Sequence, residues 1–164
     1  MHLRPAQPDD AAAIAAIYNH YILTTSISFE ETTVDAGEIA RRMASVGDAG
    51  LPYLVAEDHG EVTGYAYATA WRVRPAYRNS VETSVYLAAG THARGTGTAL
   101  YRLLLAQLTE RGYHLAIGGI AQPNPASVAL HEKLGFEKVA LFKEVGRKFG
   151  QWVDVGYWQR ILGE

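Results

Sequence analysis

Two glycines separated by one residue, Gly95-Thr96-Gly97, join a segment with strand character to a segment with helix character. The run Ser-Val-Tyr-Leu at 84–87 is typical of a strand, and leucines recur at helical spacing after the glycines, at Leu100, Leu103, Leu104 and Leu108. Glycines at a helix start let successive backbone N–H groups converge at the positive end of the helix dipole. Such a joint favours a phosphate ligand, although a plain helix-entry turn fits Gly-x-Gly alone equally well.

Composition narrows the classes of partner and chemistry. A chain of 164 residues that is 48% hydrophobic suits one compact domain spanning residues 1–164. The net charge of -2 indicates neither nucleic acid nor an anionic membrane as partner. Because the chain has no cysteine, we expect no disulfide, no thiolate zinc site and no thiol nucleophile, and we predict no metal-binding residues. It has neither an apolar leader nor a long apolar run, so we expect a cytoplasmic protein.

The apolar periodicity alternates between helix and strand along the chain. We expect helices at about 10–21, 35–46, 97–111 and 126–134, and strands at about 53–57, 62–71, 81–87, 115–120, 137–145 and 152–161. Asp35 and Glu38 resemble a capping pair, the turn at 58–61 predicts a hairpin, and Gly135 ends the last helix. This order predicts a single mixed sheet with helices packed on it.

Further motifs stand in register with the glycine joint. Asn124-Pro125-Ala126-Ser127 opens the helix after the 115–120 strand, and Leu134-Gly135-Phe136 closes it. Together with the loop at 94–97, this arrangement resembles the GCN5-related N-acetyltransferase (GNAT) superfamily. The segments at 17–21, 57–65, 71–77, 81–86 and 149–156 resemble more closely its phosphinothricin and methionine sulfoximine acetyltransferases. The resemblance therefore covers nearly the whole chain.

The resemblance implies the fold and the cosubstrate. The fold would be the α+β, mixed α/β fold of GNAT acyl-CoA N-acyltransferases: a mostly antiparallel central sheet flanked by helices, with strands that splay apart at the cofactor site. Acetyl-CoA would place its pyrophosphate on backbone N–H groups of the glycine joint and its pantetheine arm along the exposed strand edge. Relatives usually carry Gln or Arg at the position of His92, but the backbone donors do not depend on that side chain.

The cofactor-binding residues implied by the resemblance share the strand edge, the joint and the following helix. They are Val85, Tyr86, Leu87, Ala93, Arg94, Gly95, Thr96, Gly97, Thr98, Asn124, Ser127 and Lys133. An ordinary edge strand remains an alternative for the first of these, and a solvated helix lysine for the last.

Acetyl transfer to an amine requires a neutral nucleophile, so a nearby group must accept the ammonium proton. The resemblance places a catalytic glutamate at Glu82, whose pKa would rise if its carboxylate lay in a closed cleft. Many superfamily members carry a tyrosine on the helix after Asn124 that protonates the departing thiolate, and the matching residue here is His131. His131 could act as that acid, share the base role, or be a satisfied core histidine.

The segment 71–77 contains two arginines and two aromatic residues just before Glu82. Arg74, or Arg72 as second choice, would hold the carboxylate of a small amino acid, unless both are ordinary surface charges. The resemblance adds Phe29, Glu30, Pro75, Ala76 and Tyr77 to the lining of the substrate site. We therefore predict direct acetylation of the α-amine of a small amino acid or analogue, such as phosphinothricin, methionine sulfoximine or methionine sulfone.

Two other functions and the oligomeric state complete the expectations. A peptide or protein amine as acceptor would need an open groove, and a noncatalytic acetyl-CoA sensor would keep the glycine joint without needing Glu82 or His131. The resembled branch forms homodimers, and the aromatic stretch 152–158 with the tyrosines of the first helix exceeds what one small core needs. We therefore expect a twofold homodimer, with monomeric burial of these aromatics as the alternative.

Overall fold

The computed structural model describes residues 1–91 and 94–163, and its strands form one seven-stranded sheet in the order β1-β2-β3-β4-β5-β7-β6. The strands are β1 (His2–Pro5), β2 (Tyr53–Asp58), β3 (Glu61–Ala70), β4 (Ser80–Leu87), β5 (Leu115–Ala121), β6 (Glu137–Lys148) and β7 (Gln151–Ile161). The helices are α1 (Ala11–Thr24), α2 (Ala36–Asp48), α3 (Thr96–Glu110) and α4 (Pro125–Lys133), with short 3-10 turns at Pro8–Asp10 and Pro75–Tyr77. In this part of the chain only β4 and β5 pair in parallel.

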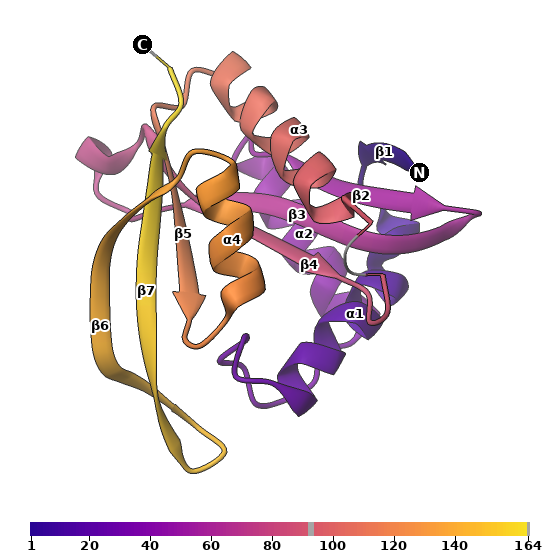
Figure 1. Ribbon diagram of the computed structural model, residues 1–164. Coiled ribbons are helices and arrows are strands. Elements are labelled where there is room, and N and C mark those ends of the chain that lie inside the picture. The colour runs from indigo at the N-terminus through magenta and orange to yellow at the C-terminus, as the bar shows by residue number, and fades with distance from the viewer. Residues whose placement is uncertain (92–93, 164) are drawn as a thin grey trace.

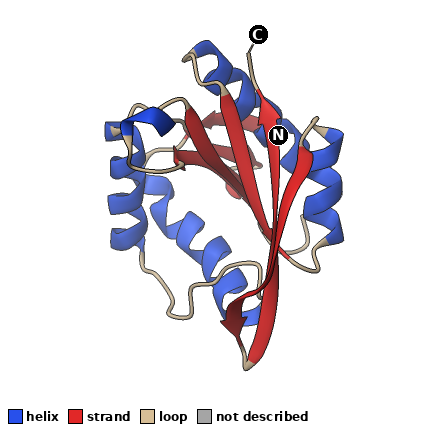
Figure 2. Ribbon diagram, turned by 90° about the vertical axis from the view of Figure 1, so that its left-hand side faces the viewer, coloured by secondary structure: helices blue, strands red, loops and turns tan. Residues whose placement is uncertain are grey.

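Helices cover both faces of the sheet, with α3 and α4 on one face and α1 and α2 on the other (Figures 1 and 2). Leu100, Leu104 and Leu108 of α3 are fully buried in the first layer, and Ile14 and Ile22 of α1 are buried in the second. Strands between two such layers carry apolar residues on both faces. The predicted mixed, mostly antiparallel sheet flanked by helices is confirmed.

The parallel pair at the centre of the sheet is short. Ser80, Val81 and Glu82 pair with 115–117, and beyond this point the two strands separate (Figure 1). The amide of Ala88 donates to Thr63 of β3 and the carbonyl of Ser80 accepts from Trp71, so even-numbered residues of β4 direct their backbone groups toward β3. The groups of residues 85 and 87 therefore face the gap, because successive strand residues alternate in direction.

Most local signals have the expected structure. The Asp35 side chain accepts the Glu38 amide at 2.8 Å and caps α2. His59 and Gly60 both have positive φ, as the tight turn between β2 and β3 requires. The helix that begins after Asn124 ends before Gly135, whose φ is 87°.

Two elements differ from the prediction. Strand β1 was not predicted, since four residues are too few to show a period of two, and antiparallel pairing with β2 fixes this strand. Strand β6 continues to Lys148 rather than ending near residue 145, because a bulge around Glu144 (φ 55°) lets the pairing with β7 resume at Gly146. Within the described residues no helix is both long and apolar enough to cross a bilayer.

Candidate active site

A cleft of about 390 Å³ lies between the exposed edge of β4, the start of α3 and the helix α4. Ten of the predicted cofactor residues line it: Val85, Tyr86, Leu87, Gly95, Thr96, Gly97, Thr98, Asn124, Ser127 and Lys133. Arg94 is exposed and is not part of this lining. The predicted contact Ala93 lies outside the described residues, as does His92.

The glycine joint presents its backbone to this cleft. Gly95 has a φ of 78° and its carbonyl accepts the first helical bond, from Ala99 at 3.0 Å. The N–H groups of the first turn, residues 96–98, precede that bond and have no acceptor within the helix. A Cβ on Gly97 would lie 3.4 Å from Leu87, so a larger side chain at this position would narrow the cleft. The joint has the open backbone donors that a diphosphate requires.

Side chains from α1 and α4 complete the cleft. Asn124 caps α4 by accepting the Ser127 amide at 3.2 Å. The Tyr21 hydroxyl donates to the Leu87 carbonyl at 2.5 Å, so one edge group of β4 already has a protein partner. The Leu87 carbonyl oxygen keeps a second lone pair that can accept another hydrogen bond. The backbone N–H and C=O of Val85 form no hydrogen bond with a side chain of the described residues.

A second cavity, of about 580 Å³, lies on the far side of the separated strands. Its lining comes from α1, the loop between α1 and α2, the strands β4 and β5, and the β6–β7 hairpin: Tyr18, Ile27, Ser28, Phe29, Glu30, Glu82, Tyr86, Gly119, Ala121, Val145, Val155 and Tyr157. We call it the acceptor cavity. A narrow cavity of about 60 Å³ lies between it and the cofactor cleft and shares lining residues with both, among them Ile27 and Tyr86. The two larger spaces therefore adjoin at the separated strands.

Glu82 lies where the strands separate. It is half-buried, and its Oε1 would be 3.6 Å from a Cβ placed on Gly119 of β5. Burial raises the pKa of the carboxyl group above its ordinary value. No described residue forms a hydrogen bond or ion pair with this side chain, so the carboxylate faces the acceptor cavity without a partner.

His131 is 4% exposed, and both of its ring nitrogens have protein partners. Nδ1 lies 2.7 Å from the Ser127 carbonyl, which can only accept, so Nδ1 carries the proton. Nε2 lies 2.8 Å from the Tyr101 hydroxyl, which is in turn 2.5 Å from the Thr83 hydroxyl. Burial lowers the pKa of the imidazole and favours the neutral ring, in which Nε2 accepts from Tyr101. The ring also lines the narrow cavity.

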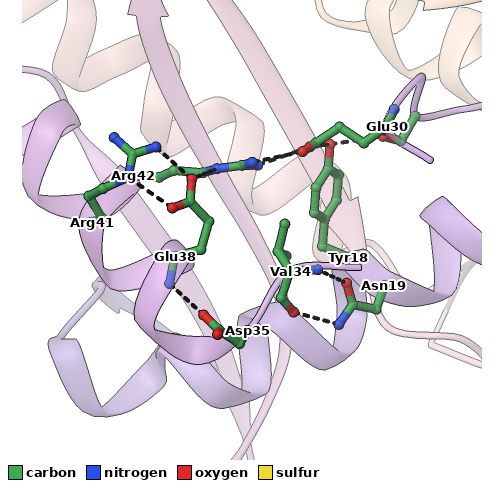
Figure 3. Close-up of polar contacts among 9 residues, drawn as sticks. Tyr18, Asn19, Glu30, Val34, Asp35, Glu38, Arg41 and Arg42 are labelled. Atoms are coloured by element: carbon green, nitrogen blue, oxygen red, sulfur yellow. Dashed lines mark hydrogen bonds and ion pairs between the residues drawn. The ribbon is translucent and has the colours of Figure 1, made fainter. Parts of the chain in front are cut away.

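Glu30 lines the acceptor cavity, and its carboxylate has partners on α1 and α2 (Figure 3). Arg42 of α2 reaches both oxygens, at 2.7 and 2.9 Å, and the Tyr18 hydroxyl donates to the same carboxylate. Hydrogen bonding to Arg42 lowers the pKa of Glu30 against the opposing effect of burial, and the group is therefore a carboxylate at neutral pH. Arg42 also donates a hydrogen bond to the carboxylate of Glu38, which accepts two more from Arg41.

The segment 72–77 lies outside the acceptor cavity. Arg72, Arg74 and Tyr77 border a separate depression with Trp71, while Pro75 and Ala76 are exposed and line neither space. Of Arg72 and Arg74, only Arg72 is connected to the acceptor cavity through aromatic contacts of the described residues. Its guanidinium lies 5.0 Å from the Trp71 ring centre, and that ring meets Tyr157 edge-on at 5.8 Å. Within the described residues, Arg74 forms no side-chain hydrogen bond or ion pair.

A model of the acetyltransferase (GNAT) domain matches residues 3–156. The chain belongs to the GNAT acetyltransferase family. It is 44% identical to a phosphinothricin N-acetyltransferase of Alcaligenes faecalis, over 98% of this chain and 82% of that protein. It is 38% identical to an L-methionine sulfoximine/L-methionine sulfone acetyltransferase of Salmonella typhimurium, over 100% of this chain and 96% of that one.

Solved GNAT structures share the fold closely. A phosphinothricin acetyltransferase from Sinorhizobium meliloti in complex with acetyl-CoA has a TM-score of 0.96 at 41% identity, covering 99% of this chain and 89% of its own. A ribosomal-protein-alanine N-acetyltransferase from Brucella melitensis has a TM-score of 0.97 at 38% identity, covering 99% of this chain and 100% of its own.

Sequence reasoning missed much of the acceptor side of this GNAT site. Tyr157, Val145 and Val155 reach the cavity from the long hairpin, and Tyr18 reaches it from α1. One signal was available: Gly118-Gly119 lies in a buried strand, where glycine marks a close approach. A Cβ on the first would lie 2.6 Å from the His131 ring, and one on the second 3.1 Å from the Tyr157 ring.

Proposed function

We propose that the protein is an acetyl-CoA-dependent N-acetyltransferase that acts on the α-amine of a small amino acid or analogue, with phosphinothricin, methionine sulfoximine and methionine sulfone as the first candidates. The observation that carries this proposal is the continuity of the site. The cofactor cleft and the acceptor cavity adjoin where β4 and β5 separate, and Glu82 faces the acceptor side. The names of the relatives at 38% and 44% identity support the same substrate class.

The residues of the cleft fit coenzyme A. The free N–H groups at 96–98 would bind the pyrophosphate, and the gap-facing backbone of Val85 and Leu87 would pair with the pantetheine amides. Asn124 and Ser127 line the opposite side of this path, and Lys133 would meet the phosphate end of the nucleotide. When bound, acetyl-CoA supplies the activated acetyl group.

Glu82 is the proposed base. Its carboxylate accepts a proton from the acceptor's ammonium group, either directly or through one water molecule, and leaves an amine that can attack the thioester carbonyl. The new C–N bond forms and the C–S bond breaks, and coenzyme A leaves as a thiolate that takes up a proton from water. The chain has no cysteine, so the acetyl group does not pass through a cysteinyl thioester. Burial suits this role, since a raised pKa brings the carboxylate closer to the basicity that proton abstraction needs.

A proton-transfer role for His131 stays a prediction, and the hydrogen bonds of both ring nitrogens to protein groups oppose it. The Nδ1 proton is donated to Ser127 and Nε2 accepts from Tyr101, so exchange with a ligand would require one of these bonds to break. The arrangement supports a positioning role, in which His131 links α4 to Tyr101 of α3 and, through that hydroxyl, to Thr83 of β4.

For the substrate carboxylate, we propose Arg72 ahead of Arg74, which reverses the order suggested by the sequence. Arg72 lies beside Trp71, whose ring contacts Tyr157 of the acceptor cavity. The fork of an arginine matches a carboxylate in a bidentate geometry. Exchanging each arginine for methionine tests the order: Arg72→Met is expected to raise the KM for the amino acid more than Arg74→Met does.

Acetylation of a peptide or protein amine is the second candidate, favoured by the name of the similar Brucella melitensis structure. The acceptor cavity is walled by the 27–30 loop and the β6–β7 hairpin, which suits a small acceptor better than an extended chain. A noncatalytic acetyl-CoA sensor is the third, and an unpaired, half-buried Glu82 has no purpose in such a protein.

One assay separates these functions. Coenzyme A thiol release from acetyl-CoA is measured with phosphinothricin, methionine sulfoximine, methionine sulfone, the common amino acids, polyamines and a lysine peptide. We expect release with the first three and with few common amino acids. Release with the peptide alone would favour protein acetylation, and tight acetyl-CoA binding without any release would favour the sensor.

We also propose a twofold homodimer in the cytoplasm. The aromatics that suggested a dimer are divided: Trp158, Tyr18 and Tyr21 are core residues, as the monomeric alternative expected, whereas Trp152 is 58% exposed. Other large apolar side chains are exposed on the same hairpin, namely Val139, Leu141, Phe142, Val145, Phe149 and Ile161. An exposed apolar surface of this kind suits a protein interface. Light scattering at working concentration is expected to give twice the 17.9 kDa chain mass.

A further inference from the structure

The wall of the acceptor cavity formed by residues 27–30 belongs to a loop without regular structure. This loop joins α1 to α2, and side chains hold it in place. Asn19 pairs with both backbone groups of Val34, at 2.8 and 2.9 Å, and Arg42 binds Glu30 (Figure 3). These anchors come from the two helices that flank the loop, so they fix it relative to those helices alone.

One anchor comes from the opposite end of the sequence. Lys148, the last residue of β6, donates from Nζ to the Ser28 carbonyl at 2.6 Å. The lysine is only 2% exposed, and Ser28, 4% exposed, also bonds through its hydroxyl to Tyr18 at 2.8 Å. Ser28 is thus held on one side by α1 and on the other by the hairpin.

The hairpin and the loop also touch without intervening space. Gly146 precedes Lys148 by two residues on β6, and a Cβ on this glycine would lie 2.4 Å from the Phe29 ring. Residues two apart in a strand point to the same face. The face of β6 that carries Lys148 is therefore the face pressed against the loop, and Val145 of the same strand lines the acceptor cavity.

Stability alone does not explain a lysine at position 148, because burying its charged group costs free energy. Burial lowers the pKa of its ammonium group, with Glu31 and Glu30 opposing the shift, and Ser28 is its one hydrogen-bond partner in the described chain. A buried cation with a single carbonyl partner gains little over an apolar side chain of the same length. Unlike an apolar side chain, the ammonium group donates a hydrogen bond, and this bond fixes the position of the Ser28 carbonyl.

We propose that Lys148 is a positioning residue of the acceptor cavity: its ammonium group ties Ser28 to the hairpin and thereby holds Phe29 and Glu30 in the cavity wall. This inference rests on the proposed function for its kinetic consequence, whereas the tether itself is a property of the fold. It assigns to the hairpin a part in acceptor selection, since the hairpin sets the position of the opposite wall.

The test compares Lys148→Met with the matched control Arg147→Met in the full-length protein. Arg147 is the preceding residue of β6, directed to the other face, where its guanidinium lies 4.6 Å from the Trp152 ring centre. We expect Lys148→Met to raise the KM for the amino acid about tenfold, the scale of one lost charge-assisted hydrogen bond, with the KM for acetyl-CoA within about twofold of wild type. A merely structural role would move both constants together, and Arg147→Met is expected to move neither.

Hydrogen exchange provides a second readout that needs no turnover. Amides in the peptide covering residues 25–34 are expected to exchange faster in Lys148→Met than in wild type, while peptides from α3 are unchanged. Equal exchange in this peptide together with an unchanged KM for the amino acid would overturn the proposal. If Lys148→Met does not fold, Lys148→Arg, which keeps but displaces the donor, replaces it with the same expected direction and the same overturning result.

Failure of the proposed function and failure of the Lys148 proposal give different experimental results. A wild-type protein that acetylates no amino acid refutes the function, and the exchange of the 25–34 peptide still decides whether Lys148 holds the loop.

Discussion

The two halves of the site are constructed differently. The cofactor cleft is built around backbone groups: the amides at the start of α3 and the gap-facing groups of β4. The acceptor cavity is built from side chains of α1, β4, β5 and the β6–β7 hairpin, with a loop wall that distant residues hold in place. Backbone recognition depends on local chain geometry, whereas side-chain recognition depends on which elements meet. The first half should therefore depend on its glycines, where an added side chain would block the backbone groups, and the second on the side chains that position its walls.

The largest expected effect tests whether the halves are separable. Glu82→Gln removes the proposed base and keeps the shape of the side chain, so kcat should fall about 10³-fold, within the range for loss of a general base. Binding of acetyl-CoA, measured by calorimetry, should be unchanged because Glu82 does not line the cofactor cleft. Retention of wild-type turnover would remove Glu82 from the mechanism.

His131 lies at the junction, where a change should affect both halves. His131→Leu leaves the buried Tyr101 hydroxyl without its acceptor and should cost about 2 kcal/mol of unfolding free energy. Because the folded pKa of His131 is lowered, its contribution to stability is complete above the ordinary value near 6.5 and is lost as pH falls below it. Thermal melts from pH 5 to 8 should show this loss in wild type and not in the variant.

The cofactor half can be changed alone at Gly97. In Gly97→Val the added methyl groups meet Leu87 and Leu130, which lie 3.4 and 3.6 Å from the position of a Cβ, and narrow the cleft. The Kd for acetyl-CoA should rise about tenfold or more, the cost of misfitting one side chain. The KM for the amino acid should stay at its wild-type value, and a parallel rise in both would contradict the separation drawn here.

The acceptor half can be changed alone at Arg42. Arg42→Met frees Glu30 from its bidentate partner, and the KM for the amino acid should rise about threefold, since partly exposed ion pairs contribute at most about 1 kcal/mol. Arg41→Met is the matched control, because Arg41 contacts Glu38 and not Glu30. Equal effects from both variants would indicate a general loss of charge rather than a change in the wall.

The smallest expected effect is on the melting temperature, because burying the charged Glu82 carboxylate lowers the stability of the folded protein. Burial raises the folded pKa of Glu82, so its favourable contribution is present below the ordinary carboxyl pKa and is lost as pH rises through the folded value. Glu82→Gln is neutral throughout. Its melting temperature should match wild type at acidic pH and exceed it slightly at pH 7, and a lower value at pH 7 would show that the carboxylate has a stabilising partner.

The sequence predicted which elements meet at the cofactor cleft because the parts of this half are contiguous. The joint at 94–98, the strand before it and the capping Asn124 each combine a local conformation with a local motif. The acceptor half was predicted poorly for the opposite reason. Nothing near Lys148 in the sequence indicates Ser28, and Arg74 stands in a suggestive segment that the fold directs away from the cavity. β1 was missed because its order comes from pairing with β2 rather than from its own four residues.

The separation of β4 from β5 has a consequence for the catalytic cycle. Main-chain amides that most proteins pair within the sheet or leave at its rim are here exposed in its middle, at residues 85 and 87. Unpaired backbone groups are hydrated by water, and under the proposed function acetyl-CoA would displace that water and take over its hydrogen bonds. The missing strand pairing at the centre of the sheet would then be supplied by acetyl-CoA in each turnover and would be lost again when coenzyme A leaves.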